Sequence, residues 1–139
     1  MGERRIDVFF YGLFMDVTVL QSSGVSPANV RQAYVDNFAL RIGYRATLTP
    51  LEGARAYGML IALTHSELER LYSGPGVDQY RPEAVVAQVM RGGMAPALCY
   101  NLVVEPKPEE RNQDYALRLQ RTLRSLNFPP AYVDSVAND

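Results

Sequence analysis

The stretch GARAYGMLIALTHSELERLYSGPGVDQYR, residues 53–81, contains the change of pattern that decides the fold. The apolar run from Arg55 to Leu63 has the length and composition of a buried strand. Thr64 follows this run, and Glu67 stands three positions later, which is the spacing of a capping box. A helix should therefore begin directly after the strand. It should end at the glycine loop around Gly74-Pro75-Gly76, because glycine and proline interrupt helices.

Patterns elsewhere in the chain predict four more strands and two more helices. The further strands are Ile6 to Tyr11, Phe38 to Leu48, Ala84 to Met90 and Ala97 to Val104, with turns at Pro50 to Gly53 and Gly92-Gly93. The further helices are a short one near Ala28 to Tyr34, started by Ser26-Pro27, and an amphipathic one from Asp114 to Leu126. The apolar stripe of the second helix, Tyr115, Leu119, Leu123 and Leu126, predicts core packing. This mixture predicts an α+β domain with a curled sheet.

Composition excludes several functional classes. A chain of 139 residues fits one domain spanning 1–139, and a net charge of -1 gives no electrostatic case for nucleic acid or anionic membrane as partner. No apolar segment is long enough to span a membrane. With one cysteine, Cys99, and one histidine, His65, we expect no disulfide, no metal site and no Cys-His nucleophile pair. We expect a cytoplasmic protein with Cys99 in its core.

The stretch FFYGLFMD, from Phe9 to Asp16, is the first candidate site. A strand that ends in Tyr11-Gly12 permits a sharp turn whose backbone N–H groups converge on an anion, although a plain strand–loop junction also fits. The loop at Gly74-Pro75-Gly76 is the second candidate. A phosphate loop follows a strand and ends in Lys before a helix, whereas this loop follows a helix and has no Lys, so we reject a nucleotide cradle.

Ionisable side chains give the remaining candidates. His65 is interpreted as a surface residue at a helix start rather than a catalytic base. Five carboxylates fall in the middle of the chain: Glu52, Glu67, Glu69, Asp78 and Glu83. Glu67 is explained by the capping box, and Glu69 by a solvated helix face. Only Asp78 and Glu83 flank the exit of the glycine loop.

Four segments in consistent order carry a family resemblance. They are FFYGLFM (9–15), the stretch 53–81, ALCYNLV (97–103) and LNFPPAYVDSV (126–136). Together they resemble the γ-glutamylcyclotransferase-like family, which includes the AIG2-like proteins. The first is similar to its opening strand and Tyr-Gly-Ser/Thr-Leu loop, and the second to its helix and Leu-Asp-x-x-Glu-Gly-x-x-Tyr-x-Arg loop. The third is similar to a later strand carrying Ala and Tyr, and the fourth to a terminal Gly-Leu-Pro-x-x-Tyr segment.

The resemblance implies a fold and a reaction. The fold is a small, mixed β-barrel-like sheet of about five to six strands with two to three flanking helices and a cavity at one mouth. In active relatives the Tyr-Gly loop supplies backbone donors to a γ-glutamyl group. A Glu in the second loop takes a proton from the substrate α-amine, which closes 5-oxoproline, and returns the proton to the leaving amine. No metal or organic cofactor is implied.

This chain departs from the family pattern at the reactive positions. Aligning Leu71 and Gly76 with the family Leu and Gly puts Pro75 where the acid/base Glu stands, and Tyr72 where Asp stands. Proline has no group that can transfer a proton. Leu13 also replaces the Ser or Thr of the first loop. The resemblance therefore comes without its acid/base residue.

Three functional hypotheses follow. The first is a protein that lacks cyclotransferase activity and binds a small amino-acid-like or amine-bearing molecule. Its predicted binding residues are Tyr11, Gly12, Leu13, Phe14, Pro75, Gly76 and Tyr80. The second is an active 5-oxoproline-forming enzyme with Asp78 or Glu83 as a relocated base. The third is a protein-interaction module in which the cavity is incidental, and the oligomeric state is left open.

Overall fold

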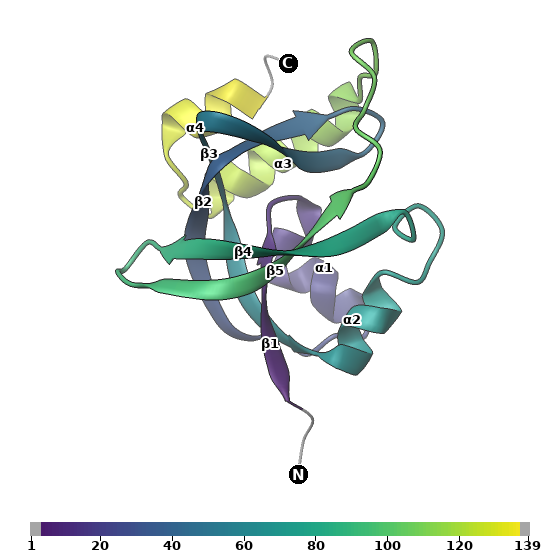
Figure 1. Ribbon diagram of the computed structural model, residues 1–139, viewed down its shortest axis with the longest axis vertical. Helices are drawn as coiled ribbons and strands as arrows, with labels where there is room; N and C mark the ends of the chain where they lie inside the picture. The colour runs from purple at the N-terminus through teal and green to yellow at the C-terminus, as the bar shows by residue number, and fades with distance from the viewer. Residues whose placement is uncertain (1–3, 137–139) are drawn as a thin grey trace.

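Pairing between the first and last strands closes the sheet into a barrel (Figure 1). The computed structural model describes residues 4–136, and its five strands are hydrogen-bonded in the order β1-β3-β2-β4-β5. Their bounds are β1 Arg5–Phe10, β2 Ala28–Ile42, β3 Ala46–Thr64, β4 Tyr80–Val89 and β5 Met94–Leu102. Neighbours run antiparallel except β1 and β5, which run parallel where Val8 pairs with Leu98.

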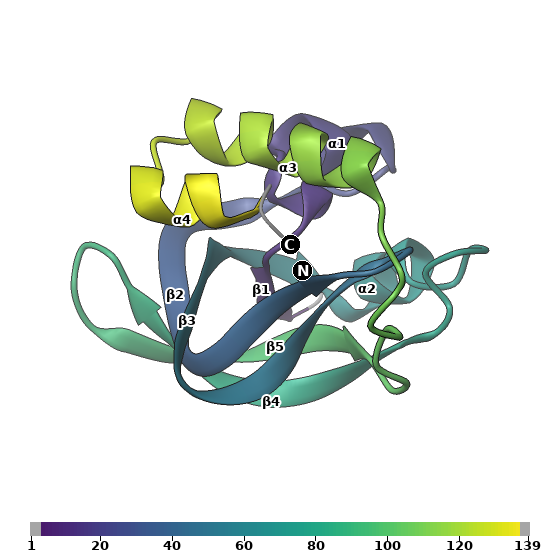
Figure 2. The same cartoon turned by 90° about the horizontal axis from the view of Figure 1, so that it is seen from above.

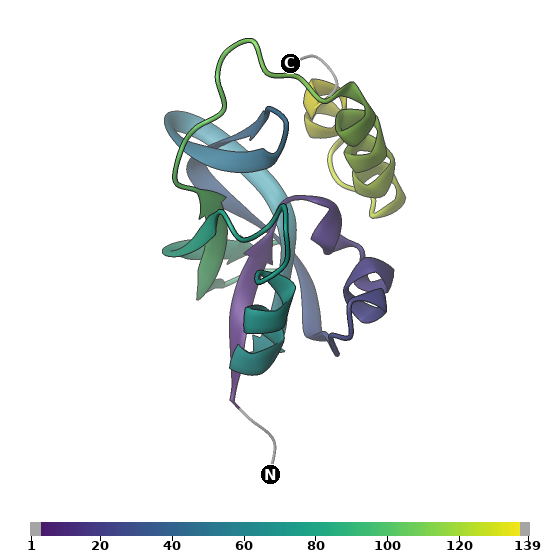
Figure 3. The same cartoon turned by 90° about the vertical axis from the view of Figure 1, so that its right-hand side faces the viewer.

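Short helices connect and cover the barrel. They are the 3-10 helix η1 Leu13–Met15 and the α-helices α1 Val17–Ser22, α2 His65–Leu71, α3 Gln113–Ser125 and α4 Pro130–Val136. Helices α1, α3 and α4 lie on one side of the barrel (Figures 2 and 3). The predicted fold class, a small barrel-like α+β domain with flanking helices, is confirmed. Residues 4–136 contain four α-helices, of which α1 and α4 were not predicted.

The strand–helix junction at Thr64 has the predicted capping box. The Thr64 hydroxyl accepts from the Glu67 backbone N–H, and the Glu67 carboxylate accepts from the Thr64 N–H at 2.9 Å. A second Glu67 oxygen accepts from the Ser26 N–H at 2.6 Å, and Arg5 approaches within 3.6 Å. Burial alone would raise the pKa of Glu67, but these backbone N–H groups and the arginine hold it below its ordinary value. Glu67 of the capping box is therefore also hydrogen-bonded to Ser26, in the segment that leads into β2.

The helix predicted at Ala28 to Tyr34 is wrong, because this segment is the start of β2. Its backbone pairs with β3, for example Arg31 with Leu60, and Asn29 takes a positive φ of 50° at a bulge. The Ser26-Pro27 signal is local and weak. Pairing along a strand of 19 residues, β3, outweighs it.

The strand predicted at Phe38 to Leu48 is also wrong, because the chain reverses inside it. The turn lies at 43–45, where the Gly43 N–H donates to the Arg45 carbonyl, so β2 and β3 form one long hairpin. The turn predicted at Pro50 to Gly53 is instead part of β3. Gly53 does take a positive φ of 83°, and its N–H donates to the Asn37 side chain at a register shift. The glycine therefore marks a bulge rather than a chain reversal.

The predicted β4–β5 hairpin and the amphipathic helix that follows it are both present. The turn at Gly92-Gly93 joins β4 to β5, and the predicted amphipathic helix is α3. Leu119 and Leu123 of α3 are fully buried in the same apolar core as the barrel strands. Tyr115, at the start of the same stripe, is only partly buried, and it has a different role.

Candidate functional site

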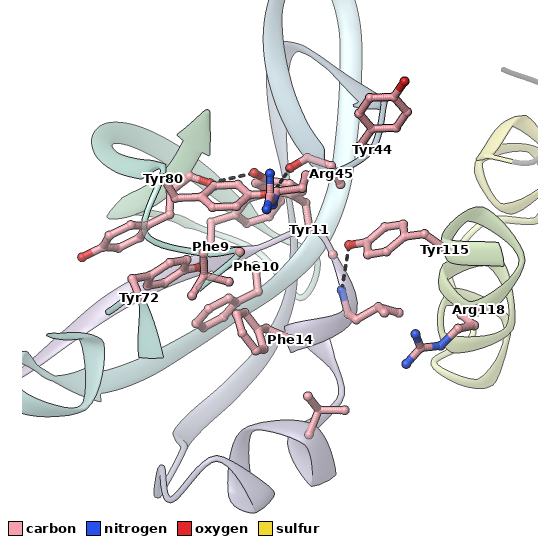
Figure 4. Close-up of a pocket in the computed structure, with 17 residues that line it drawn as sticks. Phe9, Phe10, Tyr11, Phe14, Tyr44, Arg45, Tyr72, Tyr80, Tyr115 and Arg118 are labelled. Atoms are coloured by element: carbon pink, nitrogen blue, oxygen red, sulfur yellow. Dashed lines mark hydrogen bonds between the residues drawn. The ribbon is translucent and has the colours of Figure 1, made fainter. Parts of the chain in front are cut away.

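A cavity of about 340 Å³ opens where several distant segments meet (Figure 4). They include the end of β1 with its following loop (9–14), the tip of the β2–β3 hairpin (44–46), the glycine loop after α2 (76–77) and the start of α3 (115–118). Single residues of other segments complete the lining: Val19, Tyr72, Tyr80 and Tyr100. The volume lies in the range of small-molecule sites, about 300–1,000 Å³. The barrel fixes the strand ends, and α3 provides the opposite wall.

Aromatic rings form most of the wall. Nine of the 17 lining residues are phenylalanine or tyrosine. Tyr72 stacks on Tyr100 with ring centroids 4.0 Å apart and planes inclined by 6°. Phe14 meets Tyr72 edge-on at 5.9 Å, and Phe10 meets Phe14 edge-on at 6.1 Å. Aromatic faces in these arrangements present flat, apolar surface to a ligand.

The tyrosine hydroxyls at the base of the cavity are engaged with the backbone. Tyr11 donates to the Tyr100 carbonyl at 2.7 Å, and Tyr80 donates to the Ala46 carbonyl. Burial raises the pKa of Tyr11, Tyr72, Tyr80 and Tyr115 above the ordinary value of 10.0. All four are therefore neutral phenols at neutral pH, and none can act there as a phenolate base.

A tyrosine from α3 reaches the loop that follows β1. The Tyr115 hydroxyl accepts a hydrogen bond from the Leu13 backbone N–H at 3.3 Å, which Figure 4 shows as a dashed line. A Cβ atom built on Gly12 would lie 2.4 Å from the same oxygen. Gly12 itself has an extended backbone, with φ -110° and ψ -154°. Glycine is therefore needed here for the close approach of Tyr115, and not for the sharp turn that the sequence suggested.

Two arginines supply the charge of the cavity. Arg45 comes from the hairpin tip and Arg118 from α3, and both line it. The Arg45 guanidinium lies against the glycine loop, 3.7 Å from the position that a Cβ of Gly76 would occupy, and donates to the Gln79 side chain at 3.3 Å. No carboxylate among residues 4–136 lines the cavity. The local charge is therefore positive, although the whole chain carries -1.

The structure brings most of the predicted binding residues together. Tyr11, Gly12, Leu13, Phe14, Gly76 and Tyr80 all line the cavity. Pro75 is exposed and does not line it, since the loop presents Gly76 and Val77 instead. Their role in binding stays a prediction.

Neither predicted alternative base lies on the cavity wall. Asp78 is exposed, one residue beyond Val77. Glu83 is exposed on β4, where its carboxylate accepts from the side-chain amide of the buried Asn101. His65 is exposed at the start of α2 and does not line the cavity.

Sequence patterns missed three residues of the cavity wall. Arg45 and Arg118 carried no motif, and Tyr115 was assigned to core packing although it faces the cavity. The one signal for Tyr115 was the tyrosine-rich composition of the chain, since tyrosines line pockets as well as cores.

Cys99 and all the acidic side chains of residues 4–136 lie off the cavity wall. Cys99 is completely buried, and burial raises the pKa of its thiol to about 12. Within residues 4–136, no group of three or more His, Cys, Asp or Glu side chains lies together in a way that could hold a metal ion. No helix in this part of the chain is both long and apolar enough to cross a membrane.

A closed barrel with flanking helices and a cavity beside the loop after its first strand defines a known fold class. A protein named gamma-glutamyl cyclotransferase matches with a TM-score of 0.75 at 17% identity, over 96% of this chain and 86% of its own. YkqA from Bacillus subtilis matches with a TM-score of 0.78 at 22% identity, over 98% of this chain and 54% of its own. An AIG2-like protein from Mus musculus matches with a TM-score of 0.59 at 15% identity, over 81% of this chain and 91% of its own.

The chain therefore has the γ-glutamylcyclotransferase-like fold that the sequence resemblance implied. No family model matches the chain, and no curated protein matches its sequence. At these identities the likeness establishes the fold, and function has to be argued from the site itself.

Proposed function

We propose that this protein binds a small organic molecule in the tyrosine-lined cavity and does not form 5-oxoproline. The observation that carries the proposal is the lack of any carboxylate on the cavity wall among residues 4–136. Cyclisation of a γ-glutamyl group requires one group near the substrate α-amine that takes up its proton and returns it to the leaving amine. The resembling family assigns this work to a Glu, and the sequence alignment puts Pro75, which lies off the cavity wall, at that position.

The other polar groups on the wall cannot replace the missing acid. Arginine stays protonated at any physiological pH, so Arg45 and Arg118 cannot accept a proton. The buried tyrosines hold their protons because burial raises their pKa. What remains is a preformed concave surface with hydrogen-bond donors, which suits binding.

A relocated carboxylate is the second candidate function. One observation favours it: Asp78 is one residue from Val77, which does line the cavity. A change in the glycine loop on ligand binding would be needed to turn Asp78 inward. Glu83 would need to break the hydrogen bond that its carboxylate accepts from the Asn101 side-chain amide.

Release of 5-oxoproline from a panel of γ-glutamyl amines and γ-glutamyl dipeptides tests the proposal. We expect no release above the rate without protein. Turnover that co-purifies with the protein would overturn the proposal. In that case Asp78→Asn and Glu83→Gln would identify the base, since only the variant lacking it would lose the rate.

A further inference from the structure

The charged hydrogen-bonding groups on the cavity wall are all donors. Arg45 and Arg118 can only donate. The Tyr115 oxygen accepts from the Leu13 N–H, which leaves the hydroxyl proton of Tyr115 to donate. Figure 4 shows Arg45 and Arg118 on either side of Tyr115. A ligand that satisfies these groups must carry acceptors, and a charged acceptor would satisfy them best.

Neither arginine has an acidic partner among residues 4–136. Within residues 4–136 the ion pairs are Arg5–Glu67, Arg31–Asp7 and Arg55–Asp36, and none involves the cavity. The side-chain partner of Arg45 is the neutral Gln79, which holds the guanidinium beside Gly76 of the glycine loop. The charge at this loop is therefore positive, where the family resemblance places a carboxylate.

An aromatic lining by itself would also suit a cation, because ring faces attract positive charge. The two guanidiniums on the cavity wall oppose a cationic ligand, and no carboxylate of residues 4–136 on the wall offsets their charge. The sequence led us to expect an amino-acid-like or amine-bearing ligand. Of the two charged groups of an amino acid, these contacts favour the carboxylate and disfavour the amine.

The shape of the wall indicates the rest of the ligand. The rings of Phe14, Tyr72 and Tyr100 form a continuous aromatic surface, with one stacked and one edge-on contact. The rings of Tyr72 and Tyr100 are stacked in nearly parallel planes, so this part of the lining is flat rather than rounded. A planar ring can extend such an array by stacking or by an edge-on contact.

We propose that the ligand is a small aromatic carboxylate, whose anionic end binds Arg45, Arg118 and the Tyr115 hydroxyl while its ring packs on the aromatic wall. This inference rests on the proposed function, and it replaces the γ-glutamyl amine by a different chemical class. It predicts that the protein discriminates by charge at one end of the ligand.

Three matched probes test this discrimination: 3-(4-hydroxyphenyl)propanoate, its uncharged primary amide, and tyramine. Binding to the whole protein is followed by the backbone amide shifts of Leu13 and Gly76. We expect the carboxylate to bind about tenfold or more tightly than the amide, which is the worth of a charge-assisted hydrogen bond. Tyramine should bind more weakly than the amide. Added salt should weaken binding of the carboxylate and leave binding of the amide unchanged.

Variants assign the effect to the two arginines. Arg45→Gln and Arg118→Gln should each weaken carboxylate binding about tenfold and leave amide binding unchanged. Arg91→Gln and Arg121→Gln are the controls, because they remove the same charge from exposed positions off the cavity wall and should change neither. Thermal unfolding of all four variants checks that each is folded.

Three results would overturn the inference. They are tyramine binding at least as tightly as the carboxylate, equal losses in the cavity and control variants, or no shift of Leu13 and Gly76 with any probe. Turnover in the 5-oxoproline assay would instead overturn the proposed function, so the two failures are distinguishable.

Discussion

The close approach of Tyr115 to Gly12 predicts a measurable coupling between two substitutions. The backbone of Gly12 is in a region open to any L-residue, so Gly12→Ala adds no backbone strain. The new Cβ would lie 2.4 Å from the Tyr115 oxygen, which forces that side chain to move and to lose its bond from Leu13. Overpacking of this kind costs about 1–3 kcal/mol, and the hydrogen bond about 1 kcal/mol more.

Tyr115→Phe removes the obstructing oxygen. The next atom, the ring carbon that carries it, lies 3.8 Å from the Cβ position, which is an ordinary contact. Tyr115→Phe alone should cost about 1 kcal/mol, for the lost hydrogen bond. In the Tyr115→Phe variant, adding Gly12→Ala should leave the free energy of unfolding nearly unchanged. The double variant should therefore be more stable than the sum of the single effects by about 2–4 kcal/mol.

Urea unfolding of the four proteins measures this coupling directly, through the free energy of unfolding of each. Single costs that add to within about 0.5 kcal/mol would show that Tyr115 does not occupy the space above Gly12, and the assignment of the cavity's donor groups would fail with it.

Three further predictions concern other parts of the account. Glu67→Gln should cost about 1–3 kcal/mol at pH 7, while exposed Glu69→Gln should cost little. Because folding lowers the pKa of Glu67, the stability difference between the wild-type protein and Glu67→Gln should be fully present above pH 4.5, the ordinary pKa of the group. The difference should shrink as the pH falls through the pKa of Glu67 in the folded protein. A difference that stays constant down to about pH 3 would contradict this. Pro75→Glu should release no 5-oxoproline, because residue 75 is exposed off the cavity wall; turnover would contradict this. At about pH 8 a thiol reagent should label buried Cys99 in urea but not in buffer, and equal rates would contradict its burial.

Sequence patterns predicted the parts of the fold that are decided locally. The Thr64–Glu67 capping box and the Gly92-Gly93 turn depend on residues a few positions apart, and both are present. The β2–β3 hairpin was misplaced for a physical reason. Its register depends on a bulge that joins Asn37 to Gly53, which no local rule relates. In the same way, the pairing of β2 with β3 overrode a helix-start signal at Ser26.

The candidate site was predictable only in part, for the same reason. The loop after β1 and the glycine loop each have a recognisable local pattern, and both line the cavity. The contact between Leu13 and Tyr115 joins residues 102 positions apart. Arg45 reaches the cavity only because the hairpin turns at 43–45, which the sequence placed elsewhere. The charge of the cavity therefore required the structure.

The central claim is that this cavity binds a ligand and does not convert a γ-glutamyl substrate. One NMR sample tests both parts. It contains labelled protein with a γ-glutamyl amine and, added afterwards, 3-(4-hydroxyphenyl)propanoate. We predict no 5-oxoproline signal over a day, followed by shifts at Leu13 and Gly76 when the aromatic carboxylate is added. A growing 5-oxoproline signal, or a carboxylate that leaves both amides unmoved, would contradict the account.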